Sequence, residues 1–450
     1  MDARMLPDRL RDWMSRLTTP LDARSRKYLL PVLIGVWFAQ GRRTASRWFQ
    51  AAGVGDDWQD HYYFLGSLGR KTGHVATQLL QIALRWLPSL HVGPYVRIAI
   101  DDTPTKRYGP EVEGAGQHHN PTPGPAGSKF LYGHVWVTLS WLVRHPRWGT
   151  IGLALRSLLY IRRQDLDELK AAQRRPWDFR TKLELAAELL EWAAPWFTHW
   201  LGKPVIAVVD GAYAKRPFLK RAMAAGVVVV SRLRRDAALY TVPPRRKRRR
   251  AGRPRKYGTE RIDLARRGAH RRGWTSAEFS LYGTLRTVCF KTFLATYPPV
   301  GGKIRVVIVR NDSGAGWTGF FSTDPDLPVS VILECVADRA AIEQNFHDVK
   351  EVEGAGQQQL RNVWANVGAW HLCLWAHTLV ELWSWRRSGR TLRQRAERPW
   401  DDVERRPSHA DRLKCLRRQV LGATISRLPL RTRASRKLLA LVKRLASLTA

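Results

Sequence analysis

Hydrophobic residues recur along this chain with two different periods, which separate helical segments from strand-rich ones. Near the start the apolar positions fall every three or four residues: Leu6, Leu10, Trp13, Met14 and Leu17. This is the spacing of one face of an α-helix, and helical patterns continue to about residue 90. We therefore expect a helical domain over residues 1–90.

Clustered arginines and glycine turns give this helical domain two interpretations. Arg42, Arg43 and Arg47 lie on a short amphipathic segment between Gly41 and the turn at residues 53–55. Short helices with basic clusters resemble a helix-turn-helix-like DNA-binding module. A plain helical cap with a solvated basic face shows the same pattern, and the sequence favours neither interpretation.

The middle of the chain contains short apolar and β-branched runs bounded by turn residues, which predict strands. These strands are expected at residues 96–104, 132–142, 149–155, 205–209 and 226–231, with helices at 181–200 and 214–225. The uninterrupted apolar run of Val205–Val209 is typical of a buried parallel strand. The alternation of strands and helices indicates an α/β domain with a mixed sheet and flanking helices.

Strand patterns without intervening helices come next, at residues 278–298, 303–312 and 317–323. They predict a β-rich insertion over residues 236–330. A helix is then expected from Asp338 to Glu353, because this segment lacks Pro and Gly and is followed by two helix-ending glycines, Gly354 and Gly356. An apolar helix at 360–385 and a basic C-terminal region at 386–450, with an amphipathic helix at 428–448, complete the prediction.

The charge balance narrows the class of partner. Lys and Arg number 76 against 38 Asp and Glu, which gives a net charge of +38. Such an excess repels itself unless a polyanion is bound, so nucleic acid is the leading partner and an anionic membrane the second. The start of the chain lacks the apolar core of a signal peptide, and the apolar segment 363–385 carries polar residues such as Asn366 and Glu381. We expect a soluble cytoplasmic protein without a membrane span.

Two acidic sites stand at predicted strand ends. Asp101 and Asp102 end the first strand, and Asp210 ends the strand at 205–209. Carboxylate oxygens at the carboxyl ends of central strands suit a divalent cation, although aspartates are also common where a strand turns. Alternation places Asp102 on the face of Val96, Ile98 and Ile100, and Asp101 on the other. We choose Asp102 for the site and keep Asp101 as the alternative.

The helix expected at residues 338–353 carries a mixed polar stripe. At 100° per residue, Glu343, Phe346 and Lys350 lie within about 40° of Arg339. A solvated face with an Arg339–Glu343 ion pair is the simpler interpretation. The aromatic ring beside the charges instead favours a half-buried polar site.

This stripe resembles a known family. The spacing R-x3-E-x6-K, here Arg339, Glu343 and Lys350, resembles the "YREK" signature of insertion-sequence DDE transposases, although Val336 stands where the family has tyrosine. The strand ends with Asp102 and Asp210 look like the first and second aspartates of that family. The resemblance implies a ribonuclease-H-like catalytic domain in two parts, at residues 91–235 and 331–385, separated by the β-rich insertion.

The resemblance also implies a chemistry. Asp102, Asp210 and Glu343 would be the catalytic carboxylates and would bind two Mg²⁺ ions, with Mn²⁺ as the alternative metal. Arg339 and Lys350 would contact DNA phosphates. The implied function is cut-and-paste transposition, by strand cleavage and strand transfer at the terminal repeats of an insertion sequence. The enzyme would act as a homodimer on double-stranded DNA in the bacterial nucleoid. Two alternatives stay open: a metal-dependent nuclease of the same fold that does not rejoin DNA, and a non-enzymatic or decayed DNA-binding protein.

A basic run and two aromatic residues in the predicted insertion add DNA-binding candidates. The run consists of Arg245, Arg246, Lys247, Arg248, Arg249 and Arg250. It is too charged to fold alone, and it suits sequence-independent phosphate contacts as well as plain solvation. The family carries an aromatic residue in such an insertion that holds a flipped base. Trp274 and Trp317 are candidates for this role, although tryptophan is more often a core residue.

Overall fold

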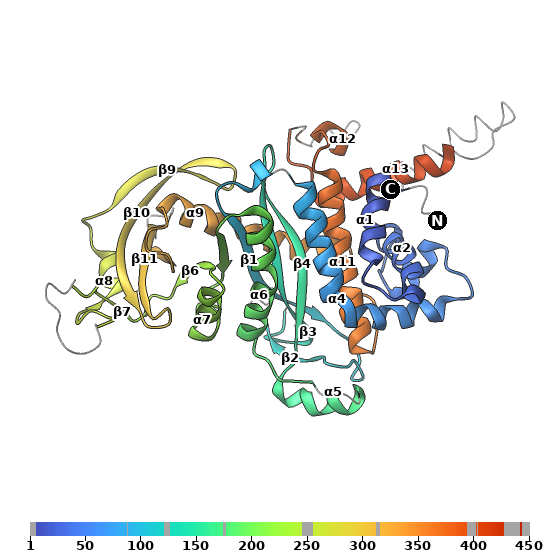
Figure 1. The fold of residues 1–450 in the computed structure, drawn as a ribbon, viewed down its shortest axis with the longest axis horizontal. Helices are drawn as coiled ribbons and strands as arrows, with labels where there is room; N and C mark the ends of the chain where they lie inside the picture. Colours follow the sequence, from blue (N-terminus) through green and yellow to red (C-terminus); the bar gives the residue numbers. More distant parts are fainter. Residues whose placement is uncertain are drawn as a thin grey trace.

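The computed structural model of the chain describes residues 6–87, 89–120, 127–173, 177–244, 255–311, 316–393, 402, 404–426 and 442. Figure 1 shows N-terminal helices at one end, a sheet flanked by helices in the middle, and a strand-rich extension at the other end. The basic run at 245–250 and nearly all of the predicted helix at 428–448 lie outside the described residues. Their expected DNA contacts therefore stay predictions.

The N-terminal region is helical, as the apolar spacing predicted. Its helices are α1 (Asp8–Thr18), α2 (Ala23–Phe38), α3 (Ala45–Ala52) and α4 (Trp58–Trp86). The glycine-containing pattern of this region predicts two helices, at residues 58–68 and 77–87, but α4 runs unbroken for 29 residues. Gly69, a helix-weakening residue within α4, has a packing role. A Cβ atom on Gly69 would lie 1.9 Å from the carbonyl oxygen of Trp364, so glycine lets α4 approach another helix closely.

The central sheet has the expected mixed topology. Its strands are β1 (Val96–Lys106), β3 (Phe130–His145), β4 (Gly149–Tyr160), β5 (Val205–Val209) and β6 (Val228–Leu233), with β2 (Gly116–His119) beside β3. The order is β4-β3-β1-β5-β6, in which β3 is antiparallel to β1 and β4 is antiparallel to β3. Strands β5 and β6 run parallel to β1. The ribonuclease-H-like sheet expected from the sequence is thus confirmed.

Strand β1 extends beyond the proline that was expected to end it. Pro104 pairs with Val135 of β3, and the strand continues to Lys106. Proline cannot donate a ladder hydrogen bond, but β5 pairs with β1 only as far as Ile100. Beyond Ile100 no described strand pairs with this edge of β1, so among the described residues the missing N–H group does not interrupt a ladder.

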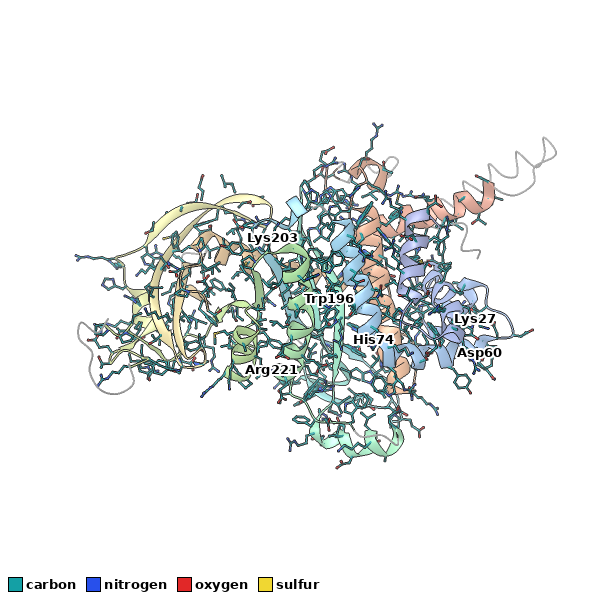
Figure 2. All side chains as sticks on the ribbon, viewed as in Figure 1. Lys27, Asp60, His74, Trp196, Lys203 and Arg221 are labelled. Atoms are coloured by element: carbon teal, nitrogen blue, oxygen red, sulfur yellow. The ribbon has the colours of Figure 1, made fainter. Side chains whose placement is uncertain are left out.

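Helices cover both faces of this sheet. Helices α6 (Lys182–Leu201) and α7 (Arg216–Ala224) lie on one face, and Arg221 of α7 pairs with Glu191 of α6 through two hydrogen bonds of 2.6 and 2.7 Å (Figure 2). On the other face, Ala99 and Val208 pack against residues of the helices that follow the insertion, such as Ile342 and Ile332. Successive residues of β1 and β5 therefore point to different helices.

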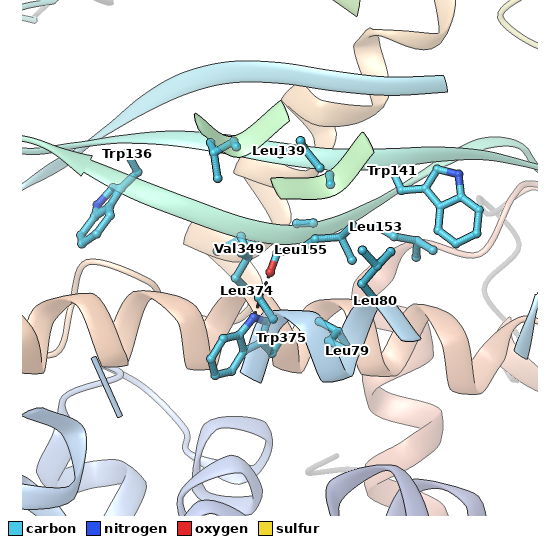
Figure 3. Close-up of a cluster of buried hydrophobic side chains, with 14 of the residues drawn as sticks. Leu79, Leu80, Trp136, Leu139, Trp141, Leu153, Leu155, Val349, Leu374 and Trp375 are labelled. Atoms are coloured by element: carbon cyan, nitrogen blue, oxygen red, sulfur yellow. Dashed lines mark hydrogen bonds between the residues drawn. The ribbon is translucent and has the colours of Figure 1, made fainter. Parts of the chain in front are cut away.

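The main core lies between the sheet and two long helices. Figure 3 shows side chains of β3 and β4 above those of α4 and α11 (Val363–Ser384), with the Trp375 indole donating a hydrogen bond of 3.0 Å to the carbonyl of Leu155. Every residue of α11 is buried except its partly exposed Trp364. This confirms that the apolar segment is a core helix. Among the described residues no helix is both long and apolar enough to cross a membrane.

The predicted β-rich insertion joins the same sheet. Its main strands are β9 (Thr275–Leu281), β10 (Thr284–Tyr297), β11 (Gly302–Arg310) and β12 (Trp317–Ser322), and small elements β7 (Leu239–Tyr240), β8 (Arg261–Ile262) and α8 (Leu264–Ala269) lie beside them. Strand β12 pairs antiparallel with β6, so the described strands form one 12-stranded sheet. Alternating burial along these strands could predict their existence but not this edge-to-edge connection.

The helix predicted at residues 338–353 consists of shorter pieces. Helix α9 (Val329–Asp338) is followed by α10 (Ala340–His347) and by the π-helical turn η4 (Asp348–Val352). The chain tightens at Arg339, whose carbonyl accepts a 3.0 Å hydrogen bond from the Ile342 amide, three residues on. Gly354 ends the segment at a φ of 74°, as its position predicted. Short helices α5 (Leu166–Gln173) and α12 (Gly389–Arg393) and the longer α13 (His409–Ser426) complete the described chain.

Candidate active site

The adjacent aspartates near the middle of β1 point to opposite faces of the sheet. Asp101 shares its face with Ala99, which packs against Ile342 and Phe346 of α10. Asp102 shares the other face with Ile98 and Ile100, because side chains alternate along a strand. Only one carboxylate of the pair can therefore meet the helix that carries Glu343.

Asp101 meets that helix through an arginine. Arg339 donates one hydrogen bond of 2.6 Å to the Asp101 carboxylate and another of 2.6 Å to Glu343. The guanidinium therefore bridges the two carboxylates with its planar fork. Glu343 keeps 59% of its side chain exposed, so it remains accessible to a ligand. Arg339 is thus more than the i,i+4 partner that a solvated face would contain.

Burial sets the protonation of Asp101. It raises the pKa of the Asp101 carboxyl to about 6, although the attraction of Arg339 acts in the opposite direction. The neighbouring carboxylate of Asp102 adds to the rise. Burial thus destabilises the charged form of this carboxyl more than Arg339 stabilises it. A further cation nearby would stabilise the charged form.

Asp210 directly follows β5, the strand that pairs with β1. The parallel ladder between β1 and β5 ends with the pair Ile100 and Val209, so the next position on each strand is an aspartate. Val208 belongs to the same buried cluster as Ile332 and Leu333 of α9, and Asp210 follows β5 at the start of a turn. The structure thus joins Asp101 to Glu343 through Arg339, and it places Asp210 one residue beyond the last pair of the β1–β5 ladder.

Asp102 makes its hydrogen bonds with other residues than Arg339 and Glu343. Its oxygens accept hydrogen bonds of 2.6 Å from the hydroxyl of Tyr213 and 2.6 Å from the ammonium of Lys182. Lys182 opens α6, on the opposite face of the sheet from α10. Asp102 shares the face of Ile98 and Ile100, as alternation along the strand predicted. The side of the sheet on which the Glu343 helix packs cannot be read from strand alternation.

Lys350 lies in the π-helical turn, beyond the regular part of the helix. Its side chain is half-buried, and burial lowers the pKa of its ammonium. In the part of the chain that the structure describes, Lys350 has no hydrogen bond or ion pair, only a longer-range attraction to Glu351. A π-turn widens the helix, so the 100° spacing used for the stripe does not hold at this position.

A second cluster of ionisable groups lies deeper in the molecule. His377, Glu381 and His409 place potential metal-ligand atoms within 4.8 Å of one another. However, His409 hydrogen-bonds to Glu381 at 2.8 Å and to Glu353 at 2.9 Å, and Glu381 also pairs with Arg412 at 2.6 Å. Burial would lower the pKa of His409, but these carboxylates raise it to about 9. The protonated imidazole thus already supplies the positive charge that a metal would bring.

This cluster lines a cavity of about 780 Å³ on the opposite side of α10 from Glu343. Asn345 and Asp348 contribute from α10 and the π-turn, Arg406 from the segment before α13, and His409 from the first residue of α13. Neither Asp101 nor Glu343 lines it. The cavity is therefore separate from Asp101 and Glu343.

The aromatic candidates of the insertion occupy different surroundings. Trp317 is buried, and Gly268 packs against its indole. Trp274 is half-buried, with the cationic groups of Lys291 and Arg310 each 4.6 Å from its ring. Tyr282, in contrast, is 61% exposed at the β9–β10 turn. Core packing thus describes Trp317, while Trp274 is held between cations.

Acidic groups where two neighbouring central strands stop pairing, with a glutamate on a helix nearby, are typical of the class of ribonuclease-H-like enzymes. Comparison with known protein families agrees: the family described as DDE superfamily endonuclease matches residues 16–290. The match covers more than half of the chain, and the chain therefore belongs to this family. No curated protein matches the chain.

The family assignment fixes the general chemistry. The protein is a DDE-type enzyme, a nuclease or a transposase, whose substrate is DNA and whose relatives use divalent metal ions. The matched residues include Asp101, Asp102 and Asp210 but end within β10, before Arg339 and Glu343. The role of Glu343 therefore depends on the geometry of α10, not on the family match.

Proposed function

We propose that this protein is a transposase that cleaves and rejoins DNA at the ends of an insertion sequence. The observation that carries the proposal is the bridge from Asp101 through Arg339 to Glu343, with hydrogen bonds of 2.6 Å on either side. It joins the strand with the first acid to the helix with the third. Arg339, the N-cap of α10, and Glu343 within α10 both belong to the YREK-type spacing. Val336 still departs from that signature.

Asp101, Asp210 and Glu343 are the proposed metal ligands, with Asp101 replacing Asp102. Their donor set fits a hard divalent cation because all three offer carboxylate oxygens. The raised pKa of Asp101 and the arginine between two of the acids both indicate a site that needs positive charge. Two Mg²⁺ ions, when bound, would activate a water or a 3′-hydroxyl and stabilise the leaving oxygen.

The chain's own residues hold and orient the reacting groups. Asp101 is held within β1, Asp210 directly follows β5, and Glu343 lies on a helix that packs on the sheet, so rigid elements position all three carboxylates. Arg339 neutralises two of them in the absence of other cations. When a metal supplies that charge, the guanidinium is free to pair with a DNA phosphate, which its fork fits well.

Lys350 is the second proposed phosphate contact. It lacks a hydrogen bond or an ion pair among the described residues, and burial destabilises its charge. An anion that approaches along α10 would restore that stability. The absence of a tyrosine at position 336 removes a further contact to the DNA end that the YREK signature would supply.

Double-stranded DNA is the proposed substrate, both as terminal repeats and as target. The net charge of +38 supports strong and salt-dependent binding to a polyanion. The run Arg245–Arg250 is proposed to contact phosphates without reading sequence. Because two element ends must be joined, we propose a homodimer on DNA.

The proposed domain division follows the expected boundaries. A helical domain ends near residue 90. The catalytic domain comprises residues 91–235 and 331–385, which the insertion at 236–330 separates. The basic region at 386–450 follows the catalytic domain. Helix α4 packs against both β4 and α11, which makes the first boundary an extended interface. Limited proteolysis of the purified chain would locate the boundaries that separate in solution.

One experiment tests the function directly. The purified protein is incubated with Mg²⁺ and DNA that carries the flanking terminal repeats of its element, together with a labelled target duplex. A transposase yields cleaved ends and joined products. Cleavage without joining would identify a nuclease of the same fold, and metal-independent binding without cleavage would identify a DNA-binding protein only. EDTA provides the control for metal dependence.

A further inference from the structure

Asp102 lies next to the proposed metal ligand Asp101 but joins three elements on the other face of the sheet. Its own strand is β1. The hydroxyl of Tyr213 donates to one of its carboxylate oxygens at 2.6 Å, from the turn that follows β5. The ammonium of Lys182 donates to the other oxygen at 2.6 Å, from the first turn of α6.

The turn that carries Tyr213 also carries Asp210. The backbone N–H of Tyr213 donates to the carbonyl of Asp210 at 3.0 Å, and the N–H of Ala212 donates to the Asp210 carboxylate at 3.3 Å. Tyr213 is only 2% exposed, and its ring lies 6.3 Å from that of Phe218. The phenol is therefore fixed by packing, and one residue connects the main chain of Asp210 to the side chain of Asp102.

Such a connection is needed because the backbone pairing between β1 and β5 ends at this point. The ladder between β1 and β5 ends at Ile100 and Val209, one residue before Asp101 and Asp210. Two neighbouring carboxylates also repel each other when both are charged. The hydrogen bond from Tyr213 to Asp102 extends the connection between the two strands by a side-chain contact beyond the last ladder pair.

We propose that Asp102 is a positioning residue, which holds the turn with Asp210 at a fixed place beside Asp101 through Tyr213. The inference rests on the proposed function, because it takes Asp101 and Asp210 as the metal ligands. Lys182 also contributes to this arrangement. By pairing with Asp102, it keeps a third carboxylate neutralised and turned away from the ligand pair. Groups that orient metal ligands from behind typically alter metal affinity 10- to 100-fold when removed, as a rough guide.

The test uses the full-length protein and removes one oxygen atom. Tyr213→Phe keeps the packed ring but loses the hydrogen bond to Asp102. We expect calorimetric titration with Mn²⁺ to show affinity weaker by about 10-fold or more, with a melting temperature close to wild type. DNA cleavage should need correspondingly more Mg²⁺ and should recover at saturation. Tyr28→Phe is the matched control, because Tyr28 donates a 2.7 Å hydrogen bond to Asp60 on the N-terminal helices.

Two substitutions of Asp102 show whether the tyrosine acts through it. Asp102→Asn retains an oxygen that can accept from Tyr213, so it should lose less Mn²⁺ affinity than Asp102→Ala. Tyr213→Phe should add little to the loss in Asp102→Ala, because the two changes break the same contact. Additive losses would contradict a shared role. An unaltered Mn²⁺ titration in Tyr213→Phe would overturn the positioning role outright.

Substitutions of the neighbouring aspartate separate this inference from the proposed function. If Asp101→Asn abolishes Mn²⁺ binding and cleavage while Tyr213→Phe behaves as wild type, only the positioning role is wrong. If Asp101→Asn retains both and Asp102→Asn loses both at every metal concentration, Asp102 is itself the ligand. That result would overturn the assignment of Asp101 and the positioning role together.

Discussion

At the scale of single residues, the direction of a side chain decides its chemistry more than its position in a motif. Asp101 and Asp102 are consecutive and chemically identical, yet one meets Arg339 and the other meets Lys182. The sequence could narrow the first acid to this pair through the strand pattern and the turn that follows. Neither Lys182 nor Tyr213 was foreseen. The position of Tyr213, three residues after Asp210, is a weak indication in the sequence that it belongs to the site. No sequence feature indicates that Lys182 does.

Asp210→Asn is expected to abolish DNA cleavage and to leave DNA binding nearly intact. The substitution removes one carboxylate charge from the proposed metal site, while the positive surface that attracts DNA is unchanged. Cleavage with Mg²⁺ and a binding titration at fixed salt measure the two effects. Equal losses of binding and cleavage in a folded variant would indicate a structural role for Asp210.

Lys350→Ala is expected to weaken binding of the DNA end or strand joining. The melting temperature should change by less than about 2 °C, because the side chain has no hydrogen bond or ion pair among the described residues to lose. Lys170→Ala is a suitable control, since that lysine is 42% exposed on α5. Loss of stability with retained activity in Lys350→Ala would contradict the phosphate-contact role.

At the scale of elements, close contacts between helices and strands fix the site. Helices α4 and α11 touch at glycines, where Gly69 faces the backbone of Trp364 and Gly368 faces that of Leu65. Strand β12 joins the insertion to β6. Sequence periodicity predicted most of these elements, but it did not predict that α4 is continuous, because glycines in a helical pattern normally indicate breaks.

Gly69→Ala is expected to destabilise the protein by about 1–3 kcal/mol, because a methyl group there would overlap the Trp364 carbonyl. Gly66→Ala in the same helix is the matched control. Its nearest neighbour would be 3.8 Å away, so the better helix propensity of alanine should leave stability unchanged or slightly higher. Denaturant unfolding of the two variants measures the difference. Equal effects would mean that α4 and α11 are not in contact at Gly69.

The Glu353–His409–Glu381 contacts are expected to make stability depend on pH on the alkaline side. The folded protein raises the pKa of His409 from 6.5 to about 9, so it holds this proton more tightly than the unfolded chain does. The contribution is therefore complete below pH 6.5 and is lost as pH rises towards 9. Melting temperatures across this range should fall in the wild type and less in His409→Gln. A parallel pH dependence in both proteins would show that His409 is not the titrating group.

At the scale of the whole molecule, the positive charge dominates. A net charge of +38 gives a long-range attraction to DNA that no single contact determines. The charge explains why the protein binds DNA. The family match, together with the extended sheet and the accessible carboxylate of Glu343, indicates that it acts on the phosphodiester bonds of that DNA.

Replacing the residues of the Arg245–Arg250 run with Ser is expected to flatten the salt dependence of DNA binding. Each lost phosphate contact should reduce the log–log slope of affinity against salt by roughly one unit, with little change in sequence preference. Binding titrations at several salt concentrations give the slope. An identical slope in the variant would mean that the run is only solvated.

The sequence by itself determined the kind of protein. Local hydrophobic periods specify helices and strands, and the order of acidic strand ends indicated a ribonuclease-H-like fold, which the strand order confirms. It also identified α11 as a core helix, because polar groups within an apolar run are costly in lipid. These properties depend on residues close together in the chain.

Only the tertiary structure decided which carboxylates face one another. A strand exposes alternate residues on two faces. The choice between Asp101 and Asp102 therefore depends on which face α10 covers. That contact joins segments far apart in the chain, because Arg339 and Asp101 are separated by 238 positions. The same holds for Lys182, which meets Asp102 across 80 residues. Local pattern carries no information about such pairings, because they are set by how whole elements pack.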